Sequence, residues 1–219
     1  MKAISTLVVL ALAGLLVAAA GAPPAGPYFN DLEKAAVGPP PEEFYVLNGT
    51  FAVKADGGNH FLEAAGLPLE TSKLLFGPEG QALMDASAKV SATNAGPLYP
   101  EFAVGTNDDG GYRLWVLPGQ QKLELRKGDD AKATGDYKGW KSGEWTSVRI
   151  RVTAAGGGKW RVEGKAWPAA GKEPDAWAVT FDADEAPSPG RATLAANPFS
   201  ETPIRFDDLK VTPAGPAAK

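Results

Sequence analysis

The chain has 219 residues, with 22 lysine and arginine residues against 26 aspartate and glutamate residues, one histidine and no cysteine. The lack of cysteine excludes a thiol nucleophile and a sulfur-ligated metal, and His60 alone cannot form a histidine-based zinc cluster. No G-x-S-x-G elbow or phosphate-binding loop is present, which argues against serine catalysis and phosphoryl transfer. A net charge of −4 without a basic run makes nucleic acid and anionic membranes poor candidate partners.

Residues 1–20 have the pattern of a secretory signal peptide. Lys2 is followed by an apolar run that ends in the small residues Ala18 to Ala20, where cleavage is expected. The alternative is a retained membrane anchor, because the run approaches the ~17–25 residues that span a bilayer. Pro23 and Pro24 follow at once and favour cleavage. We therefore expect an exported bacterial protein, periplasmic or secreted, with no membrane span after signal removal, since exported proteins without cysteine suit bacteria.

Two further segments are predicted to be flexible. Residues 21–41 are rich in proline and glycine, and residues 213–219 form a short tail of similar composition. Residues 42–212 between them are long enough for one domain with its own core.

Within 42–212, short runs of alternating apolar and polar residues are separated by glycine, proline, asparagine and aspartate. This pattern predicts an all-β protein, a two-sheet antiparallel β-sandwich. About twelve strands are expected, at 44–47, 50–53, 60–64, 82–92, 101–105, 111–117, 122–126, 146–152, 159–167, 176–182, 191–196 and 204–211. The glycine-rich stretch 154–159 is expected to join two of them as a hairpin. One weak helical turn is expected near Pro68–Lys73.

Alternation along each strand predicts which side chains face the core. The expected inward sets are Phe51 with Val53, Phe102 with Val104, Tyr112 with Leu114 and Val116, Leu123 with Leu125, Val148 with Ile150 and Val152, Trp160 with Val162, and Trp177 with Val179 and Phe181. Trp140 lies in a loop and is expected to cap one end of the sandwich.

Three other tryptophans lie at positions that alternate with the inward-facing residues, so they are expected on the outer faces of the sheets. Trp115 shares its face with Arg113, and Trp145 shares its face with Arg149 and Arg151. Trp167 shares its face with Arg161, Glu163 and Lys165. A tryptophan on a solvent face beside charged groups suits carbohydrate, because the indole stacks on the apolar face of a sugar ring. The alternatives are a covering loop over Trp115 and a bulge that turns Trp145 inward.

Three segments resemble a known superfamily: GEWTSVRIRVTAAGGGKWRVEGKAW (143–167), TPIRFDDLKV (202–211) and YVLNGTFAVKADGGNHFLEA (45–64). In this order they resemble laminin-G-like and concanavalin A-like domains. The resemblance implies a jelly roll of two curved antiparallel sheets. Members of the superfamily include lectins, carbohydrate-binding modules, glycosidases and exported bacterial domains of unknown role.

Catalysis by a carboxylate pair is the enzymatic alternative. The resemblance implies a Glu-x-Asp-x-x-Glu strand in catalytic members, and the best match here begins at Glu173-Pro174-Asp175 without the second glutamate. Pro174 would also disturb a central strand. The cluster Asp182, Asp184 and Glu185 is expected to be solvated loop charge. A related family of 3-keto-disaccharide hydrolases has an Asn-Ser-Gly segment that this chain lacks.

A structural calcium ion is the one inorganic ligand that the sequence leaves open. Asp207 and Asp208 on the last strand, with Asp31 or Glu33 near the first, supply the oxygen ligands that calcium prefers. Because neighbouring residues on a strand point to opposite sides, one of Asp207 and Asp208 is expected to bind at most. The alternative is an edge strand whose charges discourage aggregation.

The sequence thus predicts an exported, non-catalytic binding or accessory domain for carbohydrate or a cell-envelope component. The expected ligand site comprises Trp115, Arg113, Trp145, Arg149, Arg151 and Trp167. A glycoside hydrolase or 3-keto-disaccharide hydrolase-like enzyme is the first alternative, and a structural protein-docking domain is the second.

Overall fold

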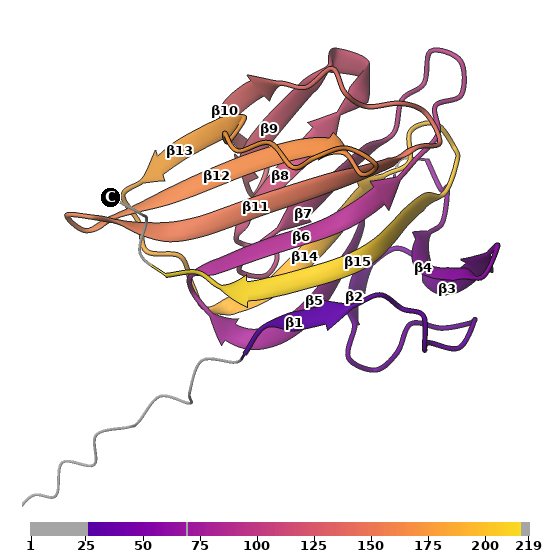
Figure 1. Cartoon of the computed structure of the whole chain (residues 1–219), viewed down its shortest axis with the longest axis horizontal. Helices are drawn as coiled ribbons and strands as arrows, with labels where there is room; N and C mark the ends of the chain where they lie inside the picture. Colours follow the sequence, from indigo (N-terminus) through magenta and orange to yellow (C-terminus); the bar gives the residue numbers. More distant parts are fainter. Residues whose placement is uncertain (1–25, 69, 216–219) are drawn as a thin grey trace, which may run out of the picture.

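The structure, a computed structural model, describes residues 26–68 and 70–215. It contains fifteen strands and one short 3₁₀ turn, Pro118–Gln120 (Figure 1). The signal-peptide prediction for residues 1–20 lies outside the described residues. In the described part of the chain, no helix is long and apolar enough to cross a membrane.

One sheet has eight strands in the order β13-β12-β11-β6-β15-β4-β3, and β1 pairs with the free half of β15 beside β4. Every pairing in it is antiparallel. Its strands are β1 (Tyr28–Asn30), β3 (Phe51–Asp56), β4 (Asn59–Ala64), β6 (Met84–Ser91), β11 (Trp145–Gly156), β12 (Lys159–Pro168), β13 (Val179–Ala183) and β15 (Ile204–Pro213).

The other sheet has seven strands in the order β10-β9-β8-β7-β14-β5-β2, again all antiparallel. Its strands are β2 (Tyr45–Asn48), β5 (Ser72–Gln81), β7 (Glu101–Gly105), β8 (Tyr112–Leu117), β9 (Lys122–Lys127), β10 (Asp130–Asp136) and β14 (Gly190–Asn197). The two sheets pack face to face, so the predicted all-β sandwich is confirmed.

One core lies between the sheets, and alternation predicted most of it. The expected inward sets on β3, β7, β8, β9 and β11 are all buried, and Trp160 and Phe181 pack against the same core from its margin. At Gly164 the sheets approach so closely that a Cβ atom would lie 2.5 Å from Leu114 Cδ1. Glycine at this inward position therefore makes room for the leucine of the opposite sheet. Trp140 packs against the core and meets Tyr99 edge to face, as expected of a cap.

All twelve predicted strands are present, but three further strands were missed. β1 has three residues, β10 lacks inward-facing large apolar residues, and β5 is interrupted by Gly77 and Gly80. These glycines have φ angles of +74° and +79°, and the register between β5 and β14 shifts near them. The glycines therefore looked like a turn in the sequence, although β5 continues through them as an irregular strand. The helical turn expected near Pro68–Lys73 was wrong, because Ser72 and Lys73 already belong to β5.

The proline- and glycine-rich segment contributes to the sandwich. β1 pairs with β15, Leu32 is fully buried in the core, and Gly38 forms a bridge with Val53. The imidazole Nδ1 of His60 lies 2.8 Å from the carbonyl oxygen of Ala35 and ties this segment to β4. The sandwich therefore begins before residue 42, and the described part of 21–41 belongs to it.

Candidate functional site

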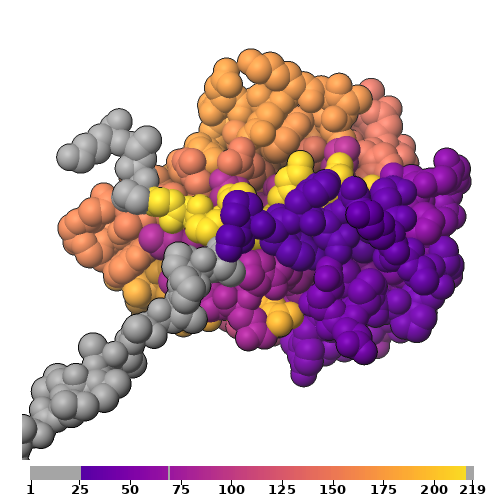
Figure 2. All heavy atoms as spheres, turned by 60° about the horizontal axis from the view of Figure 1, so that its bottom comes forward, coloured from indigo at the N-terminus to yellow at the C-terminus, as the bar shows by residue number. Residues whose placement is uncertain are grey.

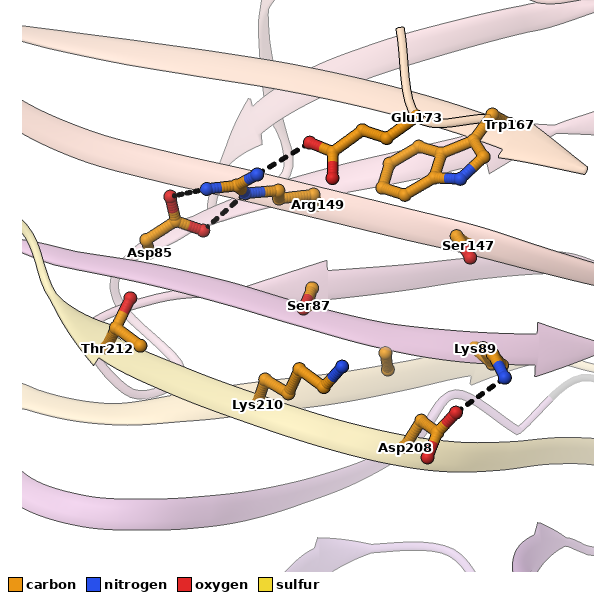
Figure 3. A pocket seen from close by; sticks show the side chains of 11 residues that line it. Asp85, Ser87, Lys89, Ser147, Arg149, Trp167, Glu173, Asp208, Lys210 and Thr212 are labelled. Atoms are coloured by element: carbon orange, nitrogen blue, oxygen red, sulfur yellow. Dashed lines mark hydrogen bonds and ion pairs between the residues drawn. The ribbon is translucent and has the colours of Figure 1, made fainter. Parts of the chain in front are cut away.

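The outer face of the eight-stranded sheet carries a hollow of about 280 Å³ (Figure 3). It crosses β12, β11, β6 and β15, and one lining residue comes from the β12–β13 connection. Its lining side chains include Asp85, Ser87, Lys89, Ser147, Arg149, Trp167, Glu173, Asp208, Lys210 and Thr212.

A second hollow of about 530 Å³ adjoins the first, and both are lined by Lys89. Its other lining residues are Asn59, Glu144, Trp145, Pro168, Ala169, Ala170 and Asp207. We call the two hollows together the outer groove. Trp145 and Trp167 are both half-buried and lie one in each hollow.

Strand register explains why these side chains meet. Trp167 pairs with Ser147, which pairs with Lys89, so the three form one row across β12, β11 and β6. β11 runs against β6 from Trp145 to Arg151 without a register shift. The bulge that would have turned Trp145 inward is therefore absent from this pairing, and Trp145 shares the outer face with Arg149, as predicted.

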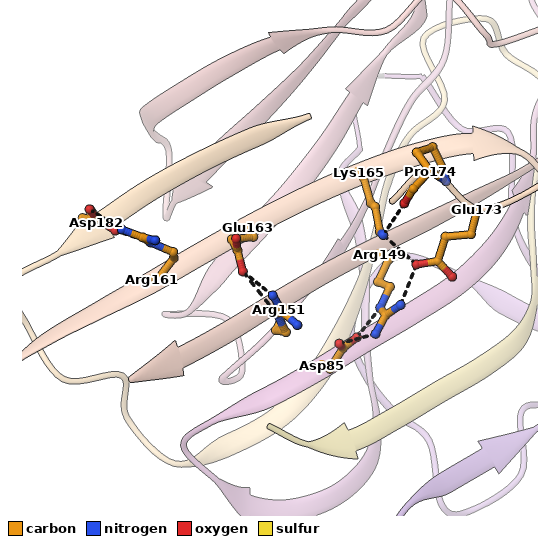
Figure 4. A network of polar contacts seen from close by, with 9 residues as sticks. All are labelled: Asp85, Arg149, Arg151, Arg161, Glu163, Lys165, Glu173, Pro174 and Asp182. Carbon is orange, nitrogen blue, oxygen red and sulfur yellow. Dashed lines mark hydrogen bonds and ion pairs between the residues drawn. The ribbon is translucent and has the colours of Figure 1, made fainter. Parts of the chain in front are cut away.

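Arg149 is the centre of an ion-pair network on this face (Figure 4). Its Nε and Nη2 atoms donate to the two oxygens of Asp85 at 2.8 and 2.6 Å, and Nη1 donates to Glu173 Oε1 at 2.5 Å. The same Glu173 oxygen lies 2.7 Å from Lys165 Nζ. The hydrogen bond with Asp85 is the largest cause that raises the pKa of Arg149 above its usual value. The guanidinium of Arg149 is thus held by protein carboxylates.

Trp177 contradicts its predicted place in the core. β13 begins only at Val179, so Trp177 belongs to the β12–β13 connection and its parity with Val179 does not apply. Its ring lies 4.5 Å from Lys165 Nζ, and 4.6 and 5.6 Å from the guanidinium carbons of Arg151 and Arg149. The connection, residues 169–178, therefore folds over the outer face as a strap, and cation–π contacts hold its tryptophan there.

The strap explains the position of Arg151. This residue lies on the predicted face but outside both hollows, and it donates to Glu163 Oε2 from Nη2 at 2.7 Å. Of the predicted site residues on the eight-stranded sheet, Trp145, Arg149 and Trp167 line the groove, and Arg151 lies under Trp177.

Trp115 and Arg113 lie on the opposite side of the molecule. Both are on the outer face of the seven-stranded sheet, away from Leu114 and Val116, so their parity was predicted correctly. Trp115 is nevertheless only 4% exposed, because it packs with Ala103, Leu117 and Ala195. The guanidinium of Arg126 also lies 5.3 Å from its ring. Trp115 and Arg113 are therefore separated from the other four predicted residues by the thickness of the sandwich.

The first hollow is electrically balanced. Three carboxylates line it, those of Asp85, Glu173 and Asp208, together with three cations, Lys89, Arg149 and Lys210. Lys89 Nζ lies 2.6 Å from Asp208 Oδ2. The hydroxyls of Ser87, Ser147 and Thr212 complete the polar lining. Such a surface favours an uncharged ligand with many hydroxyl groups over an anion or a cation.

The residues predicted for calcium do not fit the ion. Asp208 has φ +50° and lies where the register between β15 and β6 shifts, so Asp207 and Asp208 both line the outer groove, against the expected alternation. Asp207 accepts hydrogen bonds from Asn59 and from the backbone of Asp208, while Asp31 Oδ1 accepts from the backbone N–H of Glu33. Within residues 26–68 and 70–215, no group of three histidine or acidic side chains is placed to hold a metal.

A melting experiment tests the calcium prediction. Because Asp208 is already paired with Lys89, we expect 5 mM CaCl₂ and 5 mM EDTA to give the same melting temperature, within about 1 °C. A calcium-dependent rise of several degrees that is lost in Asp208→Asn would contradict this expectation.

The sequence interpretation missed several groove residues, although their parity was visible. Ala86, Ala88 and Val90 alternate inward on β6, which places Ser87 and Lys89 on the outer face. The sequence does not show that β6 lies between β11 and β15 in the sheet. Lys89 and Lys210 reach the groove because of that order.

No model of a protein family and no curated protein sequence matches the chain. Solved structures do share its architecture. A protein of unknown function with a galectin-like fold from Bacillus subtilis has a TM-score of 0.60 at 10% identity, covering 88% of this chain and 98% of that one. The apo form of Crh5 transglycosylase has a TM-score of 0.57 at 13% identity, covering 88% and 86%.

The VIP36 exoplasmic/lumenal domain in its Ca²⁺/Man₃GlcNAc-bound form has a TM-score of 0.50 at 9% identity, covering 80% of this chain and 87% of that one. The chain has a galectin-like, concanavalin A-like fold. The fold that the sequence resemblance implied is therefore confirmed, and at these identities the likeness concerns the fold.

Proposed function

We propose that the protein binds a neutral carbohydrate in the outer groove. The observation that carries the proposal is that Trp145 and Trp167 lie half-buried on one continuous face, each beside polar groups. An indole offers an apolar surface to the C–H face of a sugar ring, and neighbouring polar groups bond its hydroxyls. Lys89, on the neighbouring strand β6, lines both hollows and so is common to the two aromatic positions.

The structural neighbours support the class of ligand. Crh5 is named as a transglycosylase, and VIP36 has a Man₃GlcNAc-bound form, so carbohydrate is the common partner of these similarly folded proteins. Fold likeness alone does not carry a function, and for this reason the proposal depends on the groove and its two tryptophans.

A binding or accessory role, without catalysis, is part of the proposal. Asp85 and Glu173 both bind Arg149, and Asp208 binds Lys89, so the three carboxylates of the first hollow are held as ion pairs. In the second hollow, burial raises the pKa of Asp207, but its carboxylate is held by Asn59 Nδ2 and the backbone N–H of Asp208. A glycosidase needs a carboxyl group that keeps a proton and a second one opposite it across the bond to be cleaved. Partial burial tends to raise the pKa of Glu173, but hydrogen bonds from Lys165 and Arg149 outweigh it and lower the pKa, which makes Glu173 a poor proton donor. The proposed compartment, periplasmic or secreted, depends on residues 1–20 alone.

Binding to a glycan array tests the proposal. We expect Trp167→Ala and Trp145→Ala each to weaken binding about tenfold, since loss of one stacking platform removes roughly 1.4 kcal/mol. Phe199→Ala is the matched control, because Phe199 is 40% exposed and lines neither hollow of the groove. Equal binding by all four proteins would place the ligand elsewhere. A wild-type protein that binds no glycan would contradict the proposed function and favour a docking domain.

A further inference from the structure

Strand β1 adds an exposed aromatic side chain beside the groove. Tyr28 turns inward, with its ring centroid 6.3 Å from that of Phe76, so Phe29 points to the outer face of the sheet. Phe29 is 55% exposed. Lys210 Nζ lies 5.0 Å from the centre of its ring.

Register connects Phe29 to the groove. Phe29 pairs with Lys210 on β15, and Lys210 pairs with Ser87 on β6. Both Lys210 and Ser87 line the first hollow. The hollow therefore has Trp167 on the β12 side, and its floor continues through Lys210 towards Phe29 with no strand between β15 and β1.

Ser87 pairs with Arg149, and Arg149 pairs with Lys165, so the row of paired residues that begins at Phe29 ends at Lys165 on β12. The strap covers this end of the row. Glu173 and Pro174 O both contact Lys165 Nζ, at 2.7 Å each, and Trp177 lies over the same ammonium. A ligand therefore cannot extend over Lys165, but it can extend towards β1. In Figure 2 the indigo N-terminal residues lie beside the yellow C-terminal segment, with the orange β12–β13 region beyond it.

From this arrangement we infer that the groove binds a neutral oligosaccharide of several sugar units that runs across the strands from Trp167 to Phe29. Phe29 then forms a third aromatic platform, beyond Trp145 and Trp167, for the distal units. β12 and β1 are separated by four inter-strand spacings of ~4.8 Å, or about 19 Å, which is too long for one sugar ring. The inference rests on the proposed function and adds to it the length and direction of the ligand.

An array of neutral gluco-, manno-, xylo- and galacto-oligosaccharides of two to six units tests the inference. We expect Phe29→Ala to bind disaccharides like the wild type and to bind the longest oligosaccharides about threefold to tenfold more weakly. Phe29→Tyr keeps an aromatic ring at the same position and should restore wild-type binding. Trp167→Ala should weaken ligands of every length, and Phe199→Ala should change none.

The outcomes separate the inference from the proposed function. If Trp167→Ala weakens binding while Phe29→Ala binds every length like the wild type, the function stands and the inference is overturned. Equal weakening of all lengths by Phe29→Ala also overturns it, because a distal platform does not touch a disaccharide. If the wild-type protein binds none of these oligosaccharides, the proposed function itself fails. Thermal melting of each variant verifies that Phe29→Ala is folded.

Discussion

Replacing Asn107 with alanine is expected to lower the free energy of unfolding by about 2–4 kcal/mol, because three backbone carbonyls lose their donor at once. The two N–H groups of Asn107 Nδ2 are shared among the carbonyl oxygens of Gln81, Ala82 and Ser188, which lie at 3.1, 3.0 and 2.7 Å. The side chain is 4% exposed, so water does not readily replace it. Gln81 ends β5, Ala82 follows it in the β5–β6 connection, and Ser188 lies in the β13–β14 connection, so the β7–β8 turn ties these segments together.

The backbone of Asn107 adds a second contribution. Its φ angle is +61°, a region that asparagine tolerates and alanine disfavours. Asn107→Gly removes the side-chain hydrogen bonds without this strain, and we expect it to be slightly less destabilising than Asn107→Ala. The control is Asn94→Ala, which removes one exposed hydrogen bond, to Gly96 O, and should cost below about 1 kcal/mol. Urea unfolding measures all three, and a loss below 1 kcal/mol for both Asn107 variants would refute the prediction.

Glu173→Ala is expected to release the strap and to destabilise the protein by about 1–3 kcal/mol, because it leaves the Lys165 ammonium without a carboxylate. Lys165 is 5% exposed, and its other polar contact is Pro174 O at 2.7 Å. The estimate is below that for a fully buried pair, because the Glu173 side chain is 39% exposed and partly screened by water. In Glu173→Ala, the amides of residues 169–178 should then exchange with deuterium faster than in the wild type, while those of β11 should exchange at the wild-type rate.

The strap should also loosen in acid. Partial burial tends to raise the pKa of Glu173, but hydrogen bonds from Lys165 and Arg149 hold it below the ordinary value of 4.5. A carboxyl group whose pKa is lower in the folded state stabilises the protein above its unfolded pKa and loses this effect as pH falls through the folded pKa. We therefore expect the protection factors of the strap amides, measured against the intrinsic exchange rate at each pH, to be constant from pH 7 to pH 5 and to fall below about pH 4.5.

Glu185→Ala is the matched control for Glu173→Ala. Glu185 also pairs with a lysine, Lys127, at 2.8 Å, but its side chain is 81% exposed. We expect Glu185→Ala to leave the urea unfolding midpoint unchanged, because water screens an ion pair this exposed. If Glu173→Ala behaves like Glu185→Ala and the strap amides keep their protection, the strap is held by Trp177 and the backbone without help from Glu173.

Alternation predicted the strands and the faces of their side chains because it is a local property. Val148, Ile150 and Val152 are buried, and Trp145 and Arg149 lie on the opposite face, as their spacing requires. The prediction failed where the chain departs from a regular strand. Trp177 lies before β13 begins, and Asp208 adopts a left-handed conformation at a register shift. Sequence spacing does not reveal either departure, because both depend on contacts with distant residues.

The residue pattern was enough to predict a two-sheet antiparallel sandwich and to place Trp145 and Trp167 on faces directed away from its core. Which outward residues share a site became known from the order of the strands. This order separated Arg113 and Trp115 from the groove, placed Lys89 and Lys210 within it, and brought Phe29 beside Lys210. The physical reason is that side-chain alternation follows from bond geometry within a strand, whereas the order of strands follows from burying both sheets in one core.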